Sequence, residues 1–275
     1  MQKESKGYFT VKEIYPWLYS IYDPLNINCY LIVGNDAALL FDVAYGIGDL
    51  PATVREITDK PLVVVLGHGH HDHVNGAYQF EEVLLHEADF SLCRDKSAPE
   101  RRQYAINRLN EWKITAPNGF DPEAYLLIGP GNMKKLDIGR IFNLGDINVE
   151  VIGMEGHTPG SIGLLVKEKK VLLDSDSANP GTWLFLKESL PLSFFLNMAK
   201  RVKELDFDVY FAAHSGGPQP KSDFDLFIKA AYNATVEKSE PLTYMPGVTG
   251  YVYKEDGVGI TFSVEKNDIS GSITL

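Results

Sequence analysis

One short segment, VVVLGHGHHDHVNG at residues 63–76, holds four of the chain's seven histidines. They are His68, His70, His71 and His73, and Asp72 lies among them. Composition alone would give such a cluster in roughly one chain in ten thousand. Imidazole nitrogens and carboxylate oxygens are ligands that zinc and similar first-row metals take. In an extended or turning segment the first two ligands, His68 and His70, can aim at one point while the last two leave in another direction. The segment therefore predicts two pairs of metal ligands.

Three further candidates follow apolar runs later in the chain: His157 in GMEGHTPGS, Asp176 in VLLDSDSA and His214 in YFAAHSGGP. Singly, each is more typical of a turn or cap residue, and a polar loop without metal is the alternative for the cluster itself. Together they make seven potential ligands, which are His68, His70, Asp72, His73, His157, Asp176 and His214. Because a zinc site takes about four ligands, this set suits two ions with a bridging carboxylate and a water.

Three other residues are expected to support the site or to lie outside it. His71 sits between the two ligand pairs, and by alternation it should point elsewhere, behind the ligands or toward solvent. His86 ends the run EEVLLH and is interpreted as a strand-end residue. Asp174 precedes Asp176 by two positions, and we expect it to have a structural or supporting role.

The elements that must position these residues are predicted from apolar patterning. The run PLVVVLG at 61–67 is typical of a strand covered on both faces, and the histidine cluster begins where it ends. Short β-rich runs fill 8–44, and strand-like runs return at 147–153, 161–177 and 207–217. Helical spacing marks 49–60, 97–114, 191–205 and 222–238, while a DG turn predicts a hairpin at 250–264. We predict one domain over 1–275, with a helical insertion around 95–135 and a C-terminal hairpin around 249–265.

Composition and charge narrow the partners. The formal charge of −11, from 37 acidic and 26 basic residues, disfavours long nucleic acid and anionic membranes. No run approaches ~18 apolar residues, and the first residues lack the apolar core of a secretory signal. The two cysteines, Cys29 and Cys93, form no CxxC pair, which suits a reducing compartment. We expect a cytoplasmic protein with a small-molecule substrate and no membrane partner, and a homodimer paired through the hairpin is one further expectation.

The motif His68-x-His70-x-Asp72-His73, followed by GHTPGS around His157 and then by Asp176 and His214, resembles the metallo-β-lactamase-fold hydrolase superfamily. The resemblance covers most of the chain. It implies an α+β fold, an αββα sandwich of two mixed sheets with helices on the outer faces and a metal site at one sheet edge. It also implies that His68, His70 and His157 hold one metal, that Asp72, His73 and His214 hold a second, and that Asp176 bridges. Gly67, Ser175 and the sequence AAHS depart from common family residues, but none of these changes removes a ligand.

The activity implied is hydrolysis of a small-molecule ester, lactone, thioester or amide by a metal-bound hydroxide. The cofactors would be two divalent ions, with Zn²⁺ expected and Fe or Mn as alternatives. Asp72 would be catalytic, orienting the hydroxide and passing its proton to the leaving group. His70 stands where the diiron flavoprotein branch has Glu, which disfavours an oxygen-reducing role. The C-terminal hairpin stands where the glyoxalase II branch has a helical tail, which disfavours thioesters of glutathione. The alternatives are a small-nucleotide phosphodiesterase, a mononuclear iron oxygenase acting on a persulfide, and a non-catalytic metal-binding protein.

Substrate contacts are open at this level. Trp183 and Phe185 could form an apolar wall after Asp176, with Tyr104 and Trp112 contributing from the insertion. Phe194 and Phe195 are interpreted as core or helix-packing aromatics. Arg101 and Arg102 either catch a carboxylate or phosphate or lie on a solvated helix face.

Overall fold

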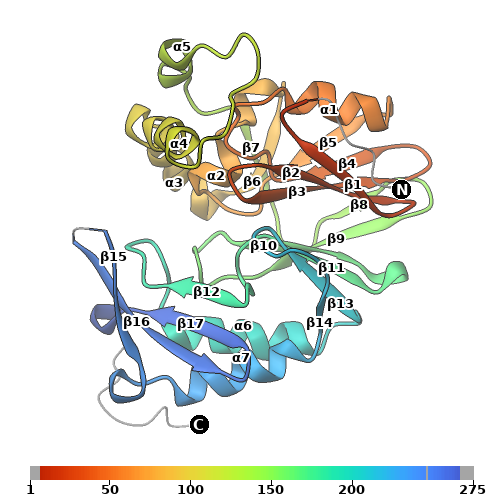
Figure 1. The fold of residues 1–275 in the computed structure, drawn as a ribbon. Helices are drawn as coiled ribbons and strands as arrows, with labels where there is room; N and C mark the ends of the chain where they lie inside the picture. The colour runs from red at the N-terminus through yellow and green to blue at the C-terminus, as the bar shows by residue number, and fades with distance from the viewer. Residues whose placement is uncertain (1–6, 246, 267–275) are drawn as a thin grey trace. The chain divides into compact units, whose positions relative to one another are not determined.

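The computed structural model describes residues 7–245 and 247–266. Its contacts divide the chain into two compact units, residues 1–150 and 151–275. The boundary falls inside strand β9 (Asn148–Gly153). Figure 1 gives the element labels, and each unit is described by itself.

The first unit contains a seven-stranded sheet in the order β1-β2-β3-β4-β5-β6-β7. Its strands are β1 (Thr10–Tyr15), β2 (Leu18–Asp23), β3 (Ile27–Val33), β4 (Ala38–Phe41), β5 (Leu62–Val65), β6 (Val83–His86) and β7 (Met133–Leu136). The first four strands form an antiparallel meander, and β4 to β7 pair in parallel. Parallel pairing requires crossover segments, and two of these carry α1 (Leu50–Ile57) and the histidine cluster.

The remaining elements of the first unit are mostly short. They are α2 (His71–Val74), α3 (Phe90–Lys96), α4 (Pro99–Glu111), α5 (Pro122–Leu126) and β8 (Ile141–Asn143), with 3₁₀ turns η1 (Ala77–Gln79) and η2 (Glu87–Asp89). Helix α1 begins where the Asp49 side chain accepts a hydrogen bond from the Ala52 amide at 2.9 Å. The segment 97–114, predicted as helical, contains α4.

The second sheet has the order β14-β13-β11-β10-β9-β8. Its strands beyond the boundary are β10 (Ile162–Val166), β11 (Val171–Asp174), β13 (Val209–Ala212) and β14 (Gln219–Pro220), with η3 (Lys167–Lys169) in the turn between β10 and β11. Strand β11 pairs in parallel with β13 and antiparallel with β10. The carboxyl ends of β11 and β13 therefore lie at the same edge, because parallel neighbours run in one direction.

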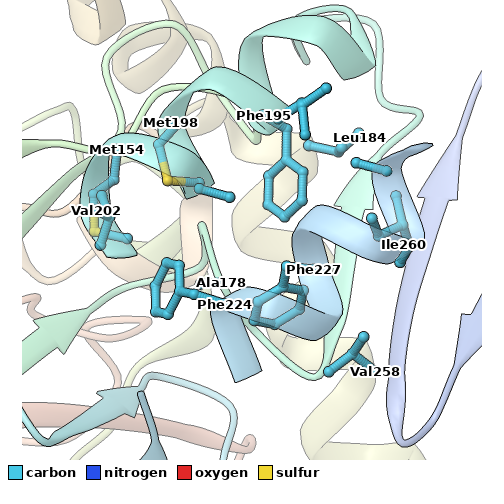
Figure 2. Packing of buried hydrophobic residues seen from close by; sticks show 14 of the residues in the cluster. Met154, Ala178, Leu184, Phe195, Met198, Val202, Phe224, Phe227, Val258 and Ile260 are labelled. Carbon is cyan, nitrogen blue, oxygen red and sulfur yellow. The ribbon is translucent and has the colours of Figure 1, made fainter. Parts of the chain in front are cut away.

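A third, four-stranded sheet has the order β12-β17-β16-β15. Its strands are β12 (Gly181–Leu184), β15 (Glu240–Met245), β16 (Val248–Glu255) and β17 (Val258–Phe262), and η4 (Val236–Lys238) and η5 (Val264–Lys266) flank them. Helices α6 (Leu192–Lys203) and α7 (Asp223–Asn233) pack against each other, and α7 packs on β16 and β17 (Figure 1). Figure 2 shows the core of this unit, where Phe195 meets Phe227 at a ring-centroid distance of 5.8 Å.

Mixed sheets together with helices confirm the α+β class. The predicted hairpin strands correspond to β16 and β17, but β12 and β15 extend them into a sheet that the sequence did not indicate. Strands β8 and β14 are too short for an alternating pattern to identify them. No helix in 7–245 or 247–266 is long and apolar enough to cross a membrane. The single domain over 1–275 stays a prediction.

Candidate functional site

The first cluster of polar side chains comprises His68, His70, Asp72 and His73, just after β5. His70 is the N-cap residue of α2, with extended backbone angles (φ −78°, ψ 151°), and the two later ligands lie inside the helix. This change from extended to helical backbone produces the two pairs. The His68 Nε2 and His70 Nδ1 atoms lie 2.9 Å apart, and the Asp72 Oδ2 and His73 Nε2 atoms lie 3.7 Å apart.

A buried carboxylate behind the cluster orients His73. Asp42 follows β4 and is 1 % exposed, and one of its oxygens lies 2.8 Å from His73 Nδ1. The other accepts the Gly67 amide at 2.7 Å, which ties down the start of the loop that carries the cluster. With the carboxylate oxygen as acceptor, Nδ1 is the donor of this hydrogen bond, and Nε2 is the ring nitrogen left for a metal.

Two glycines let this loop pack tightly. Gly69 donates its amide to Asp89 Oδ2 at 2.9 Å, and a Cβ on Gly69 would come within 3.0 Å of Leu92 Cβ. A Cβ on Gly76 would lie 2.0 Å from the Val43 carbonyl oxygen. A side chain at Gly69 would push the loop away from α3, and one at Gly76 would push it away from Val43, shortly after β4.

His71 is not a ligand in this arrangement. Its ring packs edge-on against Tyr45 and Tyr104, at centroid distances of 5.5 Å and 5.2 Å. Neither ring nitrogen has a hydrogen-bond partner among the described residues. Burial lowers the pKa of His71 to about 4, which the Asp72 carboxylate opposes in part. The imidazole is therefore neutral near pH 7 and packs between two tyrosines, which corresponds to the first of the two places expected for it, behind the ligands and not in solvent.

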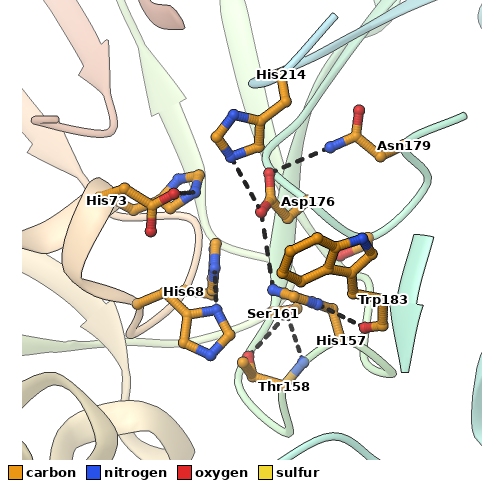
Figure 3. A network of polar contacts seen from close by, with 12 residues as sticks. His68, His73, His157, Thr158, Ser161, Asp176, Asn179, Trp183 and His214 are labelled. Carbon is orange, nitrogen blue, oxygen red and sulfur yellow. Dashed lines mark hydrogen bonds and ion pairs between the residues drawn. The ribbon is translucent and has the colours of Figure 1, made fainter. Parts of the chain in front are cut away.

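The second cluster comprises His157, Asp176 and His214, all in the second unit (Figure 3). His157 lies in the turn between β9 and β10, and the other two follow the ends of β11 and β13. The Asp176 Oδ2 atom is 3.7 Å from His157 Nε2 and 3.4 Å from His214 Nε2. One oxygen of Asp176 thus lies near the Nε2 atoms of two different histidines.

Backbone and hydroxyl groups fix His157. Its Nδ1 donates to the Trp183 carbonyl oxygen at 2.7 Å, so its Nε2 must present the lone pair. The turn is closed by Ser161, whose hydroxyl accepts the Thr158 amide at 3.1 Å and pairs with the Thr158 hydroxyl at 2.8 Å (Figure 3). These contacts hold the imidazole in one tautomer and one orientation.

Asp174 has the structural role that the sequence indicated. It is fully buried at the end of β11 and accepts the amides of Ser177 and Ala178 at 3.0 Å and 2.6 Å. These hydrogen bonds shape the turn that carries Asp176. Asn179 Nδ2 donates to Asp176 Oδ1 at 3.4 Å. His86, predicted as a strand-end residue, accepts the Ala88 amide at the end of β6.

The donor geometry within each cluster fits a metal. Two ligands at about 2.0–2.1 Å from a tetrahedral ion lie about 3.3 Å apart. The four measured donor separations run from 2.9 Å to 3.7 Å and bracket that value. Side-chain hydrogens of His73 and His157 point away from the donor atoms, as metal ligation requires. The protein therefore has His and Asp clusters able to hold metal.

The sequence did not indicate the residues that support the ligands, Asp42 and Asp89, and the two places expected for Arg102 were both wrong. Asp42 and Asp89 each follow or lie near a strand end, a signal too common to single them out. Arg102 neither catches a ligand nor lies on a solvated face. It is fully buried and donates to the carbonyls of Asn75, Ile128 and Gly129. Of the two phenylalanines interpreted as core or helix-packing residues, Phe195 is buried in the core, whereas Phe194 is 47 % exposed on α6.

Comparison with known proteins finds similarity to the metallo-beta-lactamase superfamily and to proteins named as hydrolases. Residues 22–87 match the family described as the metallo-beta-lactamase superfamily. The chain is 27% identical over 189 residues to a Gallus gallus protein named acyl-coenzyme A thioesterase MBLAC2, covering 65% of this chain and 67% of that one. It is 31% identical over 156 residues to Haemophilus influenzae hydroxyacylglutathione hydrolase GloC, covering 54% and 65%. A crystal structure of a metallo-beta-lactamase family protein, TTHA1429 from Thermus thermophilus, matches with TM-score 0.55 and 27% identity, covering 80% and 78%.

Proposed function

The chain belongs to the metallo-β-lactamase superfamily and is a metal-dependent hydrolase, and from this premise we propose that it cleaves a small-molecule thioester at a dinuclear centre. The fold class expected for the superfamily is confirmed. Ester, lactone and amide bonds remain within the proposed substrate class, since all have a carbonyl carbon open to attack. The thioester leads because two relatives carry the names of thioester hydrolases.

The observation that carries the proposal is the pairing of donors within each cluster. His68 with His70, and Asp72 with His73, offer two ligand pairs from one loop. Asp176 in the second cluster shares one oxygen between His157 and His214. We propose that His68, His70 and His157 hold one ion, that Asp72, His73 and His214 hold the second, and that Asp176 bridges the two. Seven ligands then serve two ions, as zinc coordination numbers require.

When bound, two divalent ions would supply hydroxide at neutral pH and polarise the carbonyl oxygen of the substrate. The residues of the chain do the rest. Asp42 and the Trp183 carbonyl oxygen hold Nδ1 of His73 and of His157, so that Nε2 is the ring nitrogen of each residue left to bind an ion. Asp72 has a second role in the proposal, since its carboxylate can orient the attacking water and carry its proton to the leaving group.

The test joins metal analysis with a substrate panel on the full chain. We expect about two Zn²⁺ per chain and turnover of acyl thioesters, and Asp72→Ala should abolish turnover while leaving the fold intact. Asp59→Ala, which removes an exposed carboxylate of the same unit, is the matched control. Less than one equivalent of metal under metal-replete conditions, or full activity in Asp72→Ala, would contradict the proposal.

The same panel separates the alternatives. Turnover of a small-nucleotide phosphodiester without turnover of acyl substrates would indicate a phosphodiesterase. One iron per chain with oxygen consumption on a persulfide would indicate the oxygenase, and metal binding without any turnover would indicate a non-catalytic protein. A cytoplasmic location, a small-molecule partner and a homodimer stay predictions, and light scattering of the purified chain tests the last of these.

A further inference from the structure

Three aromatic side chains gather beside the second cluster. Trp183 meets Tyr244 at a ring-centroid distance of 4.9 Å and Phe185 at 5.4 Å, and Phe185 meets Tyr244 at 6.1 Å. Trp183 and Tyr244 are half-buried, whereas Phe185 is 4 % exposed. In this group of three residues, here called the aromatic corner, one ring is buried and two rings are partly exposed.

The fold brings these residues together from opposite edges of one sheet. Trp183 belongs to β12 and Tyr244 to β15, and β17 and β16 separate these two strands. Gly250 of β16 lies under Phe185, where a Cβ would approach the Phe185 Cβ to 2.9 Å. The missing side chain lets the chain leaving β12 lie on the sheet and reach the Tyr244 ring.

The aromatic corner is joined to the metal-binding residues by a single backbone group. The Trp183 carbonyl accepts the hydrogen bond from His157 Nδ1, so the position of this residue is coupled to that of a ligand. Figure 3 shows the Trp183 indole lying beside His157 and Asp176. The backbone of Trp183 therefore holds a residue of the second cluster, and its side chain lies beside that cluster.

We propose that the aromatic corner binds an apolar acyl chain of the substrate, with Trp183 and Tyr244 as its walls and Phe185 as its floor. This inference rests on the proposed hydrolase function. The rings meet at 64–81°, so they present an angled apolar surface and no parallel slot for a planar base. A flexible alkyl chain can follow such a surface, and each methylene that it buries adds to binding.

The test uses coenzyme A thioesters from acetyl to dodecanoyl. Trp183→Ala removes the indole and keeps the carbonyl that holds His157, so it separates the side chain from the backbone contact. We expect kcat/KM of the native protein to rise with chain length. Trp183→Ala should lower it by roughly ten- to a hundredfold for dodecanoyl, mainly through KM, and by no more than about twofold for acetyl. Trp183→Phe and Tyr244→Ala should show smaller losses in the same direction.

The matched control is Phe194→Ala, which removes an exposed aromatic ring on α6 of the same unit. It should leave kcat/KM unchanged for both the acetyl and the dodecanoyl thioester. A second measurement is independent of turnover: calorimetry should show dodecanoate binding about tenfold more weakly to Trp183→Ala than to the native protein. Equal losses for acetyl and dodecanoyl in all three variants, or unchanged dodecanoate binding, would overturn the inference. Absence of any hydrolysis would instead defeat the proposed function, and the calorimetry would still decide the aromatic corner.

Discussion

The buried carboxylate of Asp42 lies 2.8 Å from Nδ1 of His73 and, through its other oxygen, accepts the Gly67 amide at 2.7 Å. One side chain thus orients an imidazole of the first cluster and anchors the start of its loop. The backbone at Asp42 has a positive φ of 65°, a conformation that Asp tolerates better than most residues. Both the side-chain hydrogen bonds and the backbone conformation therefore favour Asp at position 42.

Asp42→Asn should weaken metal binding while the fold persists. The amide nitrogen of Asn would be a donor facing either His73 Nδ1 or the Gly67 amide, so one of the two hydrogen bonds must break. Outer partners of this kind typically alter metal affinity by about 10–100-fold. Titration of zinc against a competing chelator measures the change. Asp59→Asn is the control, and equal zinc affinity of Asp42→Asn and the native protein would show that Asp42 does not tune the site.

Gly76→Ala should destabilise the first unit strongly. Its Cβ would lie 2.0 Å from the Val43 carbonyl oxygen, and a backbone atom cannot move aside as a flexible side chain can. We expect a loss in the free energy of unfolding of about 3 kcal/mol or more, measured by urea denaturation. Gly129→Ala has no atom within 4 Å of the new Cβ and should change stability by less than about 1 kcal/mol. Similar values for the two variants would mean that the loop relaxes freely.

Arg102→Met should destabilise far more than Arg101→Met, although the two residues are neighbours on α4. Arg102 is fully buried, its guanidinium lies 4.9 Å from the Tyr125 ring centroid, and it donates to three backbone carbonyls. Its loss leaves those buried acceptors unmet, which costs on the order of 3 kcal/mol. Thermal unfolding compares the two variants, and we expect Arg101→Met within about 0.5 kcal/mol of the native protein. A larger destabilisation by Arg101→Met than by Arg102→Met would show that the buried hydrogen bonds of Arg102 contribute little to stability.

Asp23 should make stability depend on pH. Burial raises the pKa of Asp23 to about 7, although the Leu25 amide and the Tyr8 hydroxyl donate to Oδ1 and oppose the rise. Between about pH 4 and pH 7 the folded protein therefore holds a proton that the unfolded chain has lost. The free energy of unfolding should fall across this window as pH rises and then level off.

Asp23→Asn removes this titration and keeps an acceptor for both donors. Relative to the native protein, the variant should gain on the order of 1–4 kcal/mol between pH 4 and pH 7, measured by urea denaturation at each pH. Asp59→Asn should track the native protein throughout. A difference between Asp23→Asn and the native protein that stays constant with pH would mean that Asp23 is ionised in the folded state.

The sequence by itself predicted the reactive side chains and their elements. Histidines and aspartates follow the strands β5, β11 and β13, and the apolar runs before them are long enough to identify. The spacing within His68 to His73 also predicted two pairs of ligands, because the positions of neighbouring side chains depend only on local backbone. Within the first cluster, the donor atoms of His68 and His70 lie 2.9 Å apart and those of Asp72 and His73 lie 3.7 Å apart, while the assignment of each pair to its own ion stays a prediction.

Tertiary structure alone decided which groups support these ligands and which aromatic rings surround them. Asp42 and His73 are 31 residues apart in the sequence, and Trp183 and His157 are 26 apart. Contacts between such distant residues cannot be predicted from the local sequence pattern. The Tyr244 ring of β15 contacts the Trp183 ring of β12, although β16 and β17 separate these two strands in the sheet. Local patterning reports how a segment buries its own face, whereas hydrogen bonds and ring contacts between distant segments depend on where the whole chain folds.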